Sequence, residues 1–217
     1  MLSFLTLDLL SYSICIAAII GFIRFKKVIK PYQPFFFFVW VALLCEIISS
    51  IRITRNEDNI AVTNVYVWIE SVLLLWLFKN WAMESKRKNY YILISLVSAA
   101  WICDNLIFHS VTRLNSAFRV IYSFVLVFLS IDQINKLMVE ERKNILLNSR
   151  FLICLTFVLF YTYKAAFEVF YIVQLPLSEY FYKSLWLIMV YVNLFANLLY
   201  AIAALWIPTR QKFTLPF

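Results

Sequence analysis

Glycine and histidine are almost absent from this chain of 217 residues, which contains one of each. The single glycine, Gly21, excludes GxxxG packing between membrane helices, because that contact needs two small residues four positions apart. The single histidine, His109, excludes the zinc sites that several histidines build in seven-helix hydrolases. The GxSxG, HExxH and phosphate-loop motifs do not occur either. The sequence therefore carries no catalytic signature, and it assigns no catalytic residue.

Cysteine is present at four positions, but never in a CxxC pair or in a charged loop. Cys15, Cys45, Cys103 and Cys154 all fall inside apolar stretches, where they are expected to be buried as small hydrophobic side chains. Neither a structural disulfide nor a thiolate metal site is expected from this distribution. We therefore predict that the protein holds no metal ion and no cofactor.

Long apolar runs make up nearly the whole chain, which is 64% hydrophobic with a mean hydropathy of +0.81. Short charged loops separate seven such runs, each about 20 residues long, which is the length that crosses a bilayer as a helix. We predict an all-α fold, a polytopic integral membrane protein whose single domain, residues 1–217, is a seven-transmembrane-helix bundle. The expected helices are residues 2–23, 32–51, 63–82, 90–109, 114–137, 151–173 and 184–207.

Lysine and arginine set the expected orientation of this bundle. Fourteen of the 20 basic residues fall on one side: Arg24, Lys26, Lys27, Lys30, Lys79, Lys86, Arg87, Lys88, Lys136, Arg142, Lys143, Arg150, Arg210 and Lys212. The side rich in basic residues is normally cytoplasmic, which predicts an outside N-terminus and an inside C-terminus. Because the first basic cluster follows the first apolar run, that run is expected to be a retained helix rather than a cleaved leader. The predicted location is the cell inner (cytoplasmic) membrane, with several passes.

Ionisable and amide side chains inside the apolar runs fall at one depth, in the half of the bilayer expected to be outer. Such groups are costly in a membrane, so each one is a candidate for function. We predict that eight of them line a ligand-binding cavity open to the outer side: Glu46, Glu70, Asp104, Arg119, Lys164, Glu168, Asn193 and Asn197. Several share one helical face, as Lys164 and Glu168 do at i and i+4.

Two interpretations of this polar layer are open. In the first, the charges neutralise one another, with Lys164 paired to Glu168 or Glu70 and Arg119 paired to one acid. In the second, a hydrated cavity separates them. The layer holds five acids, Asp8, Glu46, Glu70, Asp104 and Glu168, but only the two bases Arg119 and Lys164. Since at least three acids need another partner, we favour the hydrated cavity.

A resemblance to known proteins rests on two short stretches. Asn64, Tyr66 and Glu70 lead into Leu73, Leu74 and Leu75, and Phe118, Arg119 and Tyr122 follow later in the chain. Together these residues resemble small uncharacterised bacterial seven-helix membrane proteins, which are similar to the membrane input regions of sensor kinases. The resemblance implies a sensing or accessory role in signalling, and it names neither a ligand nor a catalytic residue.

Three functions remain open at this point, and we favour a non-enzymatic receptor or accessory protein. It would bind a small or lipidic ligand in the outward-facing cavity and signal to a cytoplasmic protein partner. The alternatives are an intramembrane lipid-modifying enzyme that uses buried carboxylates, and an oligomeric pore or membrane effector, for example in bacterial defence. Membrane lipids are expected partners and a homo-oligomer is open. Direct nucleic-acid binding is not expected, because the net charge of +8 is dispersed over helix ends.

Overall fold

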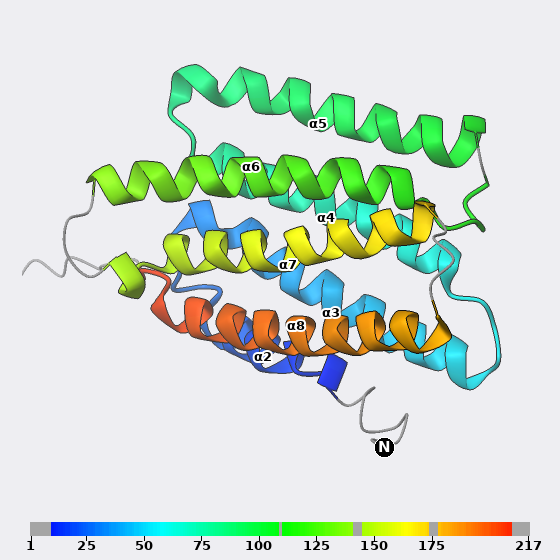
Figure 1. Cartoon of the computed structure of the whole chain (residues 1–217). Helices are drawn as coiled ribbons and strands as arrows, with labels where there is room; N and C mark the ends of the chain where they lie inside the picture. Colours follow the sequence, from blue (N-terminus) through cyan, green and yellow to red (C-terminus); the bar gives the residue numbers. More distant parts are fainter. Residues whose placement is uncertain (1–9, 109, 141–144, 174–177, 210–217) are drawn as a thin grey trace, which may run out of the picture.

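The structure, a computed structural model, describes residues 10–108, 110–140, 145–173 and 178–209. Its helices lie side by side in one bundle, with the direction of the chain reversing between successive helices (Figure 1). The main helices are α2 (Ile14–Arg24), α3 (Gln33–Thr54), α4 (Ile60–Trp81), α5 (Arg87–Ile102), α6 (Ser116–Glu140), α7 (Ser149–Val173) and α8 (Glu179–Trp206). Short 3₁₀ turns cover Lys30–Tyr32, Glu84–Lys86 and Ile145–Leu147, and a π-helical turn covers Cys103–Phe108. The described part of the chain forms no strand, and the fold is all-α as predicted.

Among the described residues, six helices are long and apolar enough to cross a membrane. They are Lys30–Thr54, Ile60–Trp81, Glu84–Ile107, Ser116–Val139, Ser149–Val173 and Glu179–Trp206, and each corresponds to one predicted span. Large apolar side chains point outward from them, for example Leu96, Phe128 and Phe195, which are 61%, 68% and 54% exposed. Such a surface suits lipid rather than water, so the chain is a multi-pass membrane protein.

The first predicted span, residues 2–23, is not among the six described helices that are long enough to cross a membrane. Residues 1–9 lie outside the described part of the chain, and Tyr12 and Ser13 form a turn before α2 begins at Ile14. α2 has 11 residues. At about 1.5 Å per residue, such a helix covers roughly half of a hydrocarbon core about 30 Å thick. A continuous first crossing is therefore not confirmed.

The loops divide the bundle into two ends. We call one the basic end: α2, α4, α6 and α8 end there, at the left of Figure 1. α3 begins there, with Pro34 in its first turn, where a missing backbone N–H costs little. The loops after α3, α5 and α7 lie at the opposite end, where the Ser178 side chain caps α8 by accepting a hydrogen bond from the backbone N–H of Phe181.

Aromatic side chains fill the core between α3, α4, α7 and α8. We call this group the aromatic cluster: Phe35, Phe38, Phe78, Phe157 and Tyr200, all of them buried. The Phe157 ring lies 6.0 Å from Phe78, 6.3 Å from Phe38 and 5.9 Å from Tyr200, measured between centroids. The contacts with Phe38 and Tyr200 are edge-to-face and the contact with Phe78 is tilted; such aromatic pairs add stability beyond the burial of area. The cluster ties the four helices together below the polar layer, towards the basic end.

Candidate functional site

The carboxylate of Glu70 is the centre of a buried hydrogen-bond network. Glu70 is 2% exposed and lies on the inner face of α4. Its Oε1 accepts hydrogen bonds from the hydroxyls of Tyr66 (3.0 Å) and Tyr161 (2.8 Å). Its Oε2 accepts from the hydroxyl of Tyr122 at 2.7 Å and from Lys164 Nζ at 3.2 Å. These four donors match the roughly four lone-pair positions of a carboxylate, so the acceptor capacity of the Glu70 side chain is filled.

Lys164 is the cation that balances Glu70. Its ammonium also contacts the Tyr122 hydroxyl and lies over three rings, Tyr122, Phe160 and Tyr161, at 5.1, 5.5 and 5.4 Å from their centroids. An aromatic wall attracts a cation through the negative face of each ring, and the attraction grows when water is excluded. Of the two acids predicted to pair with Lys164, Glu70 forms the ion pair and Glu168 does not. The three rings help to hold the Lys164 ammonium beside Glu70.

Glu168 instead pairs with Arg119, which organises a second network nearer the opposite end. Arg119 NH1 lies 3.2 Å from Glu168 Oε1, its Nε donates to Asn115 Oδ1 at 3.0 Å, and its NH2 donates to Asn64 Oδ1 at 3.1 Å. Asn64 in turn donates to the backbone carbonyls of Val111 and Arg113 at 2.8 and 2.6 Å. The second network thus joins α4, α6, α7 and the loop before α6.

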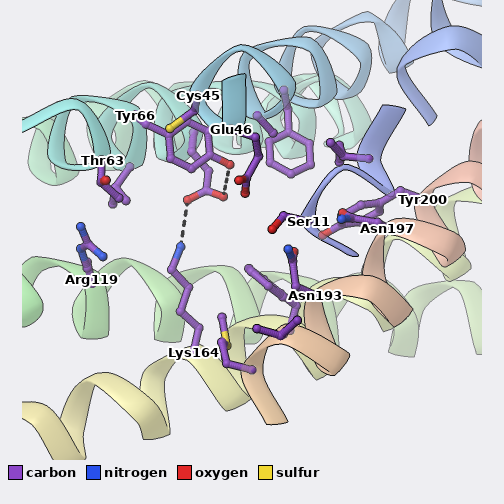
Figure 2. Close-up of a pocket in the computed structure, with 18 residues that line it drawn as sticks. Ser11, Cys45, Glu46, Thr63, Tyr66, Arg119, Lys164, Asn193, Asn197 and Tyr200 are labelled. Carbon is purple, nitrogen blue, oxygen red and sulfur yellow. Dashed lines mark hydrogen bonds and ion pairs between the residues drawn. The ribbon is translucent and has the colours of Figure 1, made fainter. Parts of the chain in front are cut away.

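A cavity of about 230 Å³ adjoins the Glu70 network, in the half of the bundle away from the basic end. Polar groups on one side of it include Glu46 and Cys45 of α3 and Thr63 of α4; Asn193 and Asn197 of α8 face them (Figure 2). Apolar side chains complete the wall: Ile14, Phe38, Ala42, Val67, Phe160, Met189 and Val190. At about 30 Å³ per water molecule, this volume is that of seven or eight waters. An apolar wall with a few convergent polar groups is typical of a small-molecule site.

Helical spacing explains why these polar groups converge. Val190, Asn193, Asn197 and Tyr200 are at i, i+3, i+7 and i+10 of α8, which places them on one face. In the same way, the cavity face of α4 carries residues 63, 66, 67 and 70. Towards the opposite end, α3 and α8 have fewer buried positions. The buried residues of α3 stop at Ala42, and those of α8 start only at Ala196. The cavity is lined by the residues just beyond these buried positions, Cys45 and Glu46 of α3 and Met189, Val190 and Asn193 of α8.

The hydroxyl of Tyr200 is buried in the cavity wall and has no hydrogen-bond partner among the described residues. Tyr200 is 3% exposed, so its hydroxyl is not simply solvated at a surface. A buried hydroxyl without a partner is costly. A water or ligand molecule that reached this hydroxyl from the cavity would remove that cost. The neighbouring Asn197 is already engaged, because its Nδ2 donates to Ser13 Oγ at 3.0 Å.

The cavity wall brings together six of the eight predicted site residues: Glu46, Glu70, Arg119, Lys164, Asn193 and Asn197. The other two do not line it. Glu168 faces Arg119 in the second network, and Asp104 lies in the π-helical turn after α5, where its Oδ2 accepts from the backbone N–H of Phe118 at 3.3 Å. α5 lies at the edge of the bundle, against α4, which keeps Asp104 away from the cavity (Figure 1). That the six residues bind a ligand stays a prediction.

The predicted site residues do not include three network tyrosines and two asparagines, Asn64 and Asn115. Each tyrosine lies one helical turn from a buried charge on its own helix: Tyr66 precedes Glu70 by four residues, Tyr122 follows Arg119 by three, and Tyr161 precedes Lys164 by three. That spacing was a usable signal, since it places a hydroxyl on the same face as the charge. Asn64 and Asn115 offered a weaker signal, because single asparagines near helix ends are common. Asp8 and His109 lie outside the described residues.

The four cysteines are free thiols, with Cys154 buried and Cys15, Cys45 and Cys103 half-buried. In the described ranges, no group of three or more histidine, cysteine, aspartate or glutamate side chains is placed to hold a metal ion. No protein-family model, curated protein or solved structure matches this chain. The two networks and the cavity are therefore the features of this chain that bear on its function.

Proposed function

We propose that the protein is a receptor or accessory protein of the membrane that binds a small polar or amphiphilic molecule in the cavity beside Glu70. The observation that carries this proposal is the combination of a cavity of about 230 Å³ with a buried Tyr200 hydroxyl that no described residue satisfies. The cavity is smaller than the roughly 300–1,000 Å³ typical of drug-sized ligands. It therefore suits a small molecule or a single polar headgroup.

The two ion pairs support binding rather than catalysis. Because four donors fill the acceptor positions of Glu70, this carboxylate is not poised to take a proton from a substrate. Of the other carboxylates in the predicted site, Glu168 and Asp104 do not line the cavity and Glu46 does. A fixed charged wall beside a largely apolar cavity with a few convergent polar groups suits a binding protein.

The expected topology completes the proposal. Seven crossings, with an outside N-terminus and an inside C-terminus, would place the basic end in the cytoplasm, in the inner membrane of a bacterial cell. The cavity would then open towards the outer side, where an external ligand arrives. The sensor role implied by the resemblance to kinase input regions has this same polarity.

Contacts of Tyr200 offer a route for a signal to the basic end. The Tyr200 ring lies 5.7 Å from Phe35 and 5.6 Å from Phe38, both in the first half of α3. At the basic end itself, the Arg24 guanidinium of α2 donates to the backbone carbonyls of Leu205 and Ile207 at the end of α8, at 2.5 and 2.9 Å. A ligand that moved α8 at Tyr200 would therefore also move the surface offered to a cytoplasmic partner.

The native Cys45 thiol provides a test, because it lines the cavity and is half-buried. In a variant that keeps only Cys45, a membrane-impermeant methanethiosulfonate reagent should react from the outer side and not from the inner side. Ala42→Phe should block the reaction by filling the cavity, whereas Ala166→Phe, which points outward on α7, should not. A variant that keeps only the buried Cys154 should stay unlabelled.

Native mass spectrometry tests binding in the same variants. Wild-type protein taken from its own membrane should carry a small molecule that Ala42→Phe loses and Ala166→Phe keeps. Equal labelling of Cys45 in both alanine variants would contradict a cavity at this site. Complete protection of Cys45 in folded protein, with nothing bound, would show a dry polar core in place of a receptor site.

A further inference from the structure

A second hollow, at the basic end, is separate from the cavity and from both networks. Its volume is about 390 Å³, and it lies between the start of α3, the last turns of α4 and the start of α5. We call it the basic groove, after its three cations Lys30, Lys79 and Arg87. These come from three different segments of the chain. Each lies within a few residues of a helix end, at the level where the ends of membrane helices meet lipid headgroups.

The positive charges of the basic groove are only partly compensated. Among the described residues that line it, none is acidic. At its rim, Arg87 NH1 lies 3.3 Å from Glu84 Oε1, an exposed pair in which water competes strongly. Lys79 Nζ lies 4.6 Å from the centre of the Tyr91 ring and donates to its hydroxyl at 3.2 Å, so this ammonium is held in place by neutral groups. The groove therefore keeps a net positive charge.

One wall of the basic groove is aromatic and faces lipid. Trp76 is 37% exposed and stacks on Phe37, with ring centroids 6.1 Å apart, and Tyr91 is 59% exposed. Tryptophan and tyrosine concentrate at the headgroup level of membranes, because their rings are apolar and their N–H or O–H group is polar. A cationic groove with such a wall can hold a charged headgroup and the first carbons of an acyl chain together.

We propose that the basic groove binds an anionic phospholipid, with the headgroup phosphate between Lys30, Lys79 and Arg87 and an acyl chain along Trp76. Basic pockets between membrane helices recognise anionic headgroups through charge-assisted hydrogen bonds. Lipid is favoured over free phosphate because the aromatic wall would add nothing to the binding of an inorganic anion. The proposal is independent of any ligand in the cavity.

The test compares phosphatidylglycerol and phosphatidylcholine of identical acyl chains, offered together to the purified full-length protein in mixed micelles. Native mass spectrometry measures the lipid retained. Wild-type protein should prefer phosphatidylglycerol, and Lys30→Gln/Lys79→Gln/Arg87→Gln should lower that preference by at least about tenfold, given roughly fivefold for each basic residue at such a surface. The matched control Lys26→Gln/Lys27→Gln/Lys88→Gln removes as many charges near the same end, at exposed positions outside the groove. Because these side chains do not line the groove, the control should change the preference several-fold less than the groove variant does.

Two further measurements address misfolding of the triple variant and the binding of free phosphate. The single variant Lys30→Glu changes an exposed side chain and should also reduce the preference, which guards against misfolding of the triple variant. Excess inorganic phosphate should not displace the retained lipid. Equal losses in the groove and control variants would overturn the proposal, because general charge would then explain binding. An unchanged preference in the groove variant, or displacement by phosphate, would overturn it as well.

Discussion

Buried ions in this bundle are stabilised by partners on other helices. Lys164 of α7 reaches Glu70 of α4, and Arg119 of α6 reaches Glu168 of α7, each at 3.2 Å. Lys164 and Glu168 lie four residues apart on one helix, yet the interhelical pairs form in preference to that intrahelical pair. Each interhelical pair joins two helices and leaves room for additional donors. The interhelical pairs Lys164–Glu70 and Arg119–Glu168 therefore fix how α4, α6 and α7 pack against one another.

The Lys164–Glu70 pair should show strong energetic coupling. Because either substitution leaves a buried charge with fewer partners, Lys164→Met or Glu70→Gln should each lower the free energy of unfolding by about 3 kcal/mol. The double variant should lose less than the sum, with a coupling of about 1–3 kcal/mol. Denaturant unfolding in mild detergent measures all four proteins.

The chain offers a matched control for this cycle. Lys183 and Glu179 form an exposed i, i+4 pair on α8 with a shorter N–O distance of 2.7 Å. Lys183→Met should have no measurable effect on unfolding, because water replaces the lost partner. If the losses at Lys164 and Glu70 were additive, the pair would not contribute to stability as a unit.

At the scale of the element, α2 packs more closely than any pattern in its sequence suggested. A Cβ atom built at Gly21 would lie 2.5 Å from Cδ1 of Phe36, whose ring is fully buried. The single glycine of the chain thus occurs where α2 meets α3, and Ala17 and Ala18 also lie on the buried face of α2. Close packing here needs one glycine against a ring rather than a GxxxG pair.

Gly21→Ala should destabilise the protein despite a better helix former. Helix propensity favours alanine by about 1 kcal/mol, but overpacking against a buried ring costs about 1–3 kcal/mol. We expect a net loss of about 1 kcal/mol in denaturant unfolding. Adding Phe36→Leu should recover part of the loss, which gives a favourable coupling in the double variant. If Gly21→Ala were as stable as the wild type, the close contact would not limit the packing of α2.

Six of the predicted spans have helices that match them to within a few residues, because a long apolar run is the strongest signal in a membrane sequence. α8 begins at Glu179, five residues before its predicted start, because the Ser178 side chain caps the helix there. The turn at Tyr12 and Ser13 was missed, because turn formation inside an apolar run leaves little trace in composition. Contacts between helices are harder to predict from one sequence. The depth of each polar residue in its apolar run predicts the polar layer, but which side chains pair depends on how each helix is rotated about its axis.

At the scale of the whole molecule, the number of crossings decides which faces of the protein meet which compartment. Six crossings would leave both ends of the chain on one side of the membrane, and seven would separate them. The basic end carries the loops after α2, α4 and α6 whatever the count. What differs is whether the segment that ends with α2 spans the bilayer, since α2 itself covers only 11 residues.

We expect seven crossings, with the two ends of the chain on opposite sides. In a background without native cysteines, Ser3→Cys should react with an impermeant thiol reagent from outside intact cells. A fluorescent protein fused to the C-terminus should mature inside the cell, whereas alkaline phosphatase fused there should be inactive. An internal control comes from Asn56→Cys in the loop after α3, which should label from outside, and Ser85→Cys after α4, which should not. Protection of Ser3→Cys together with the expected labelling at 56 would indicate six crossings and a first helix that enters and leaves on the cytoplasmic side. Active alkaline phosphatase at the C-terminus would reverse the bundle, and the cavity would then open inward, because it lies in the half away from the basic end.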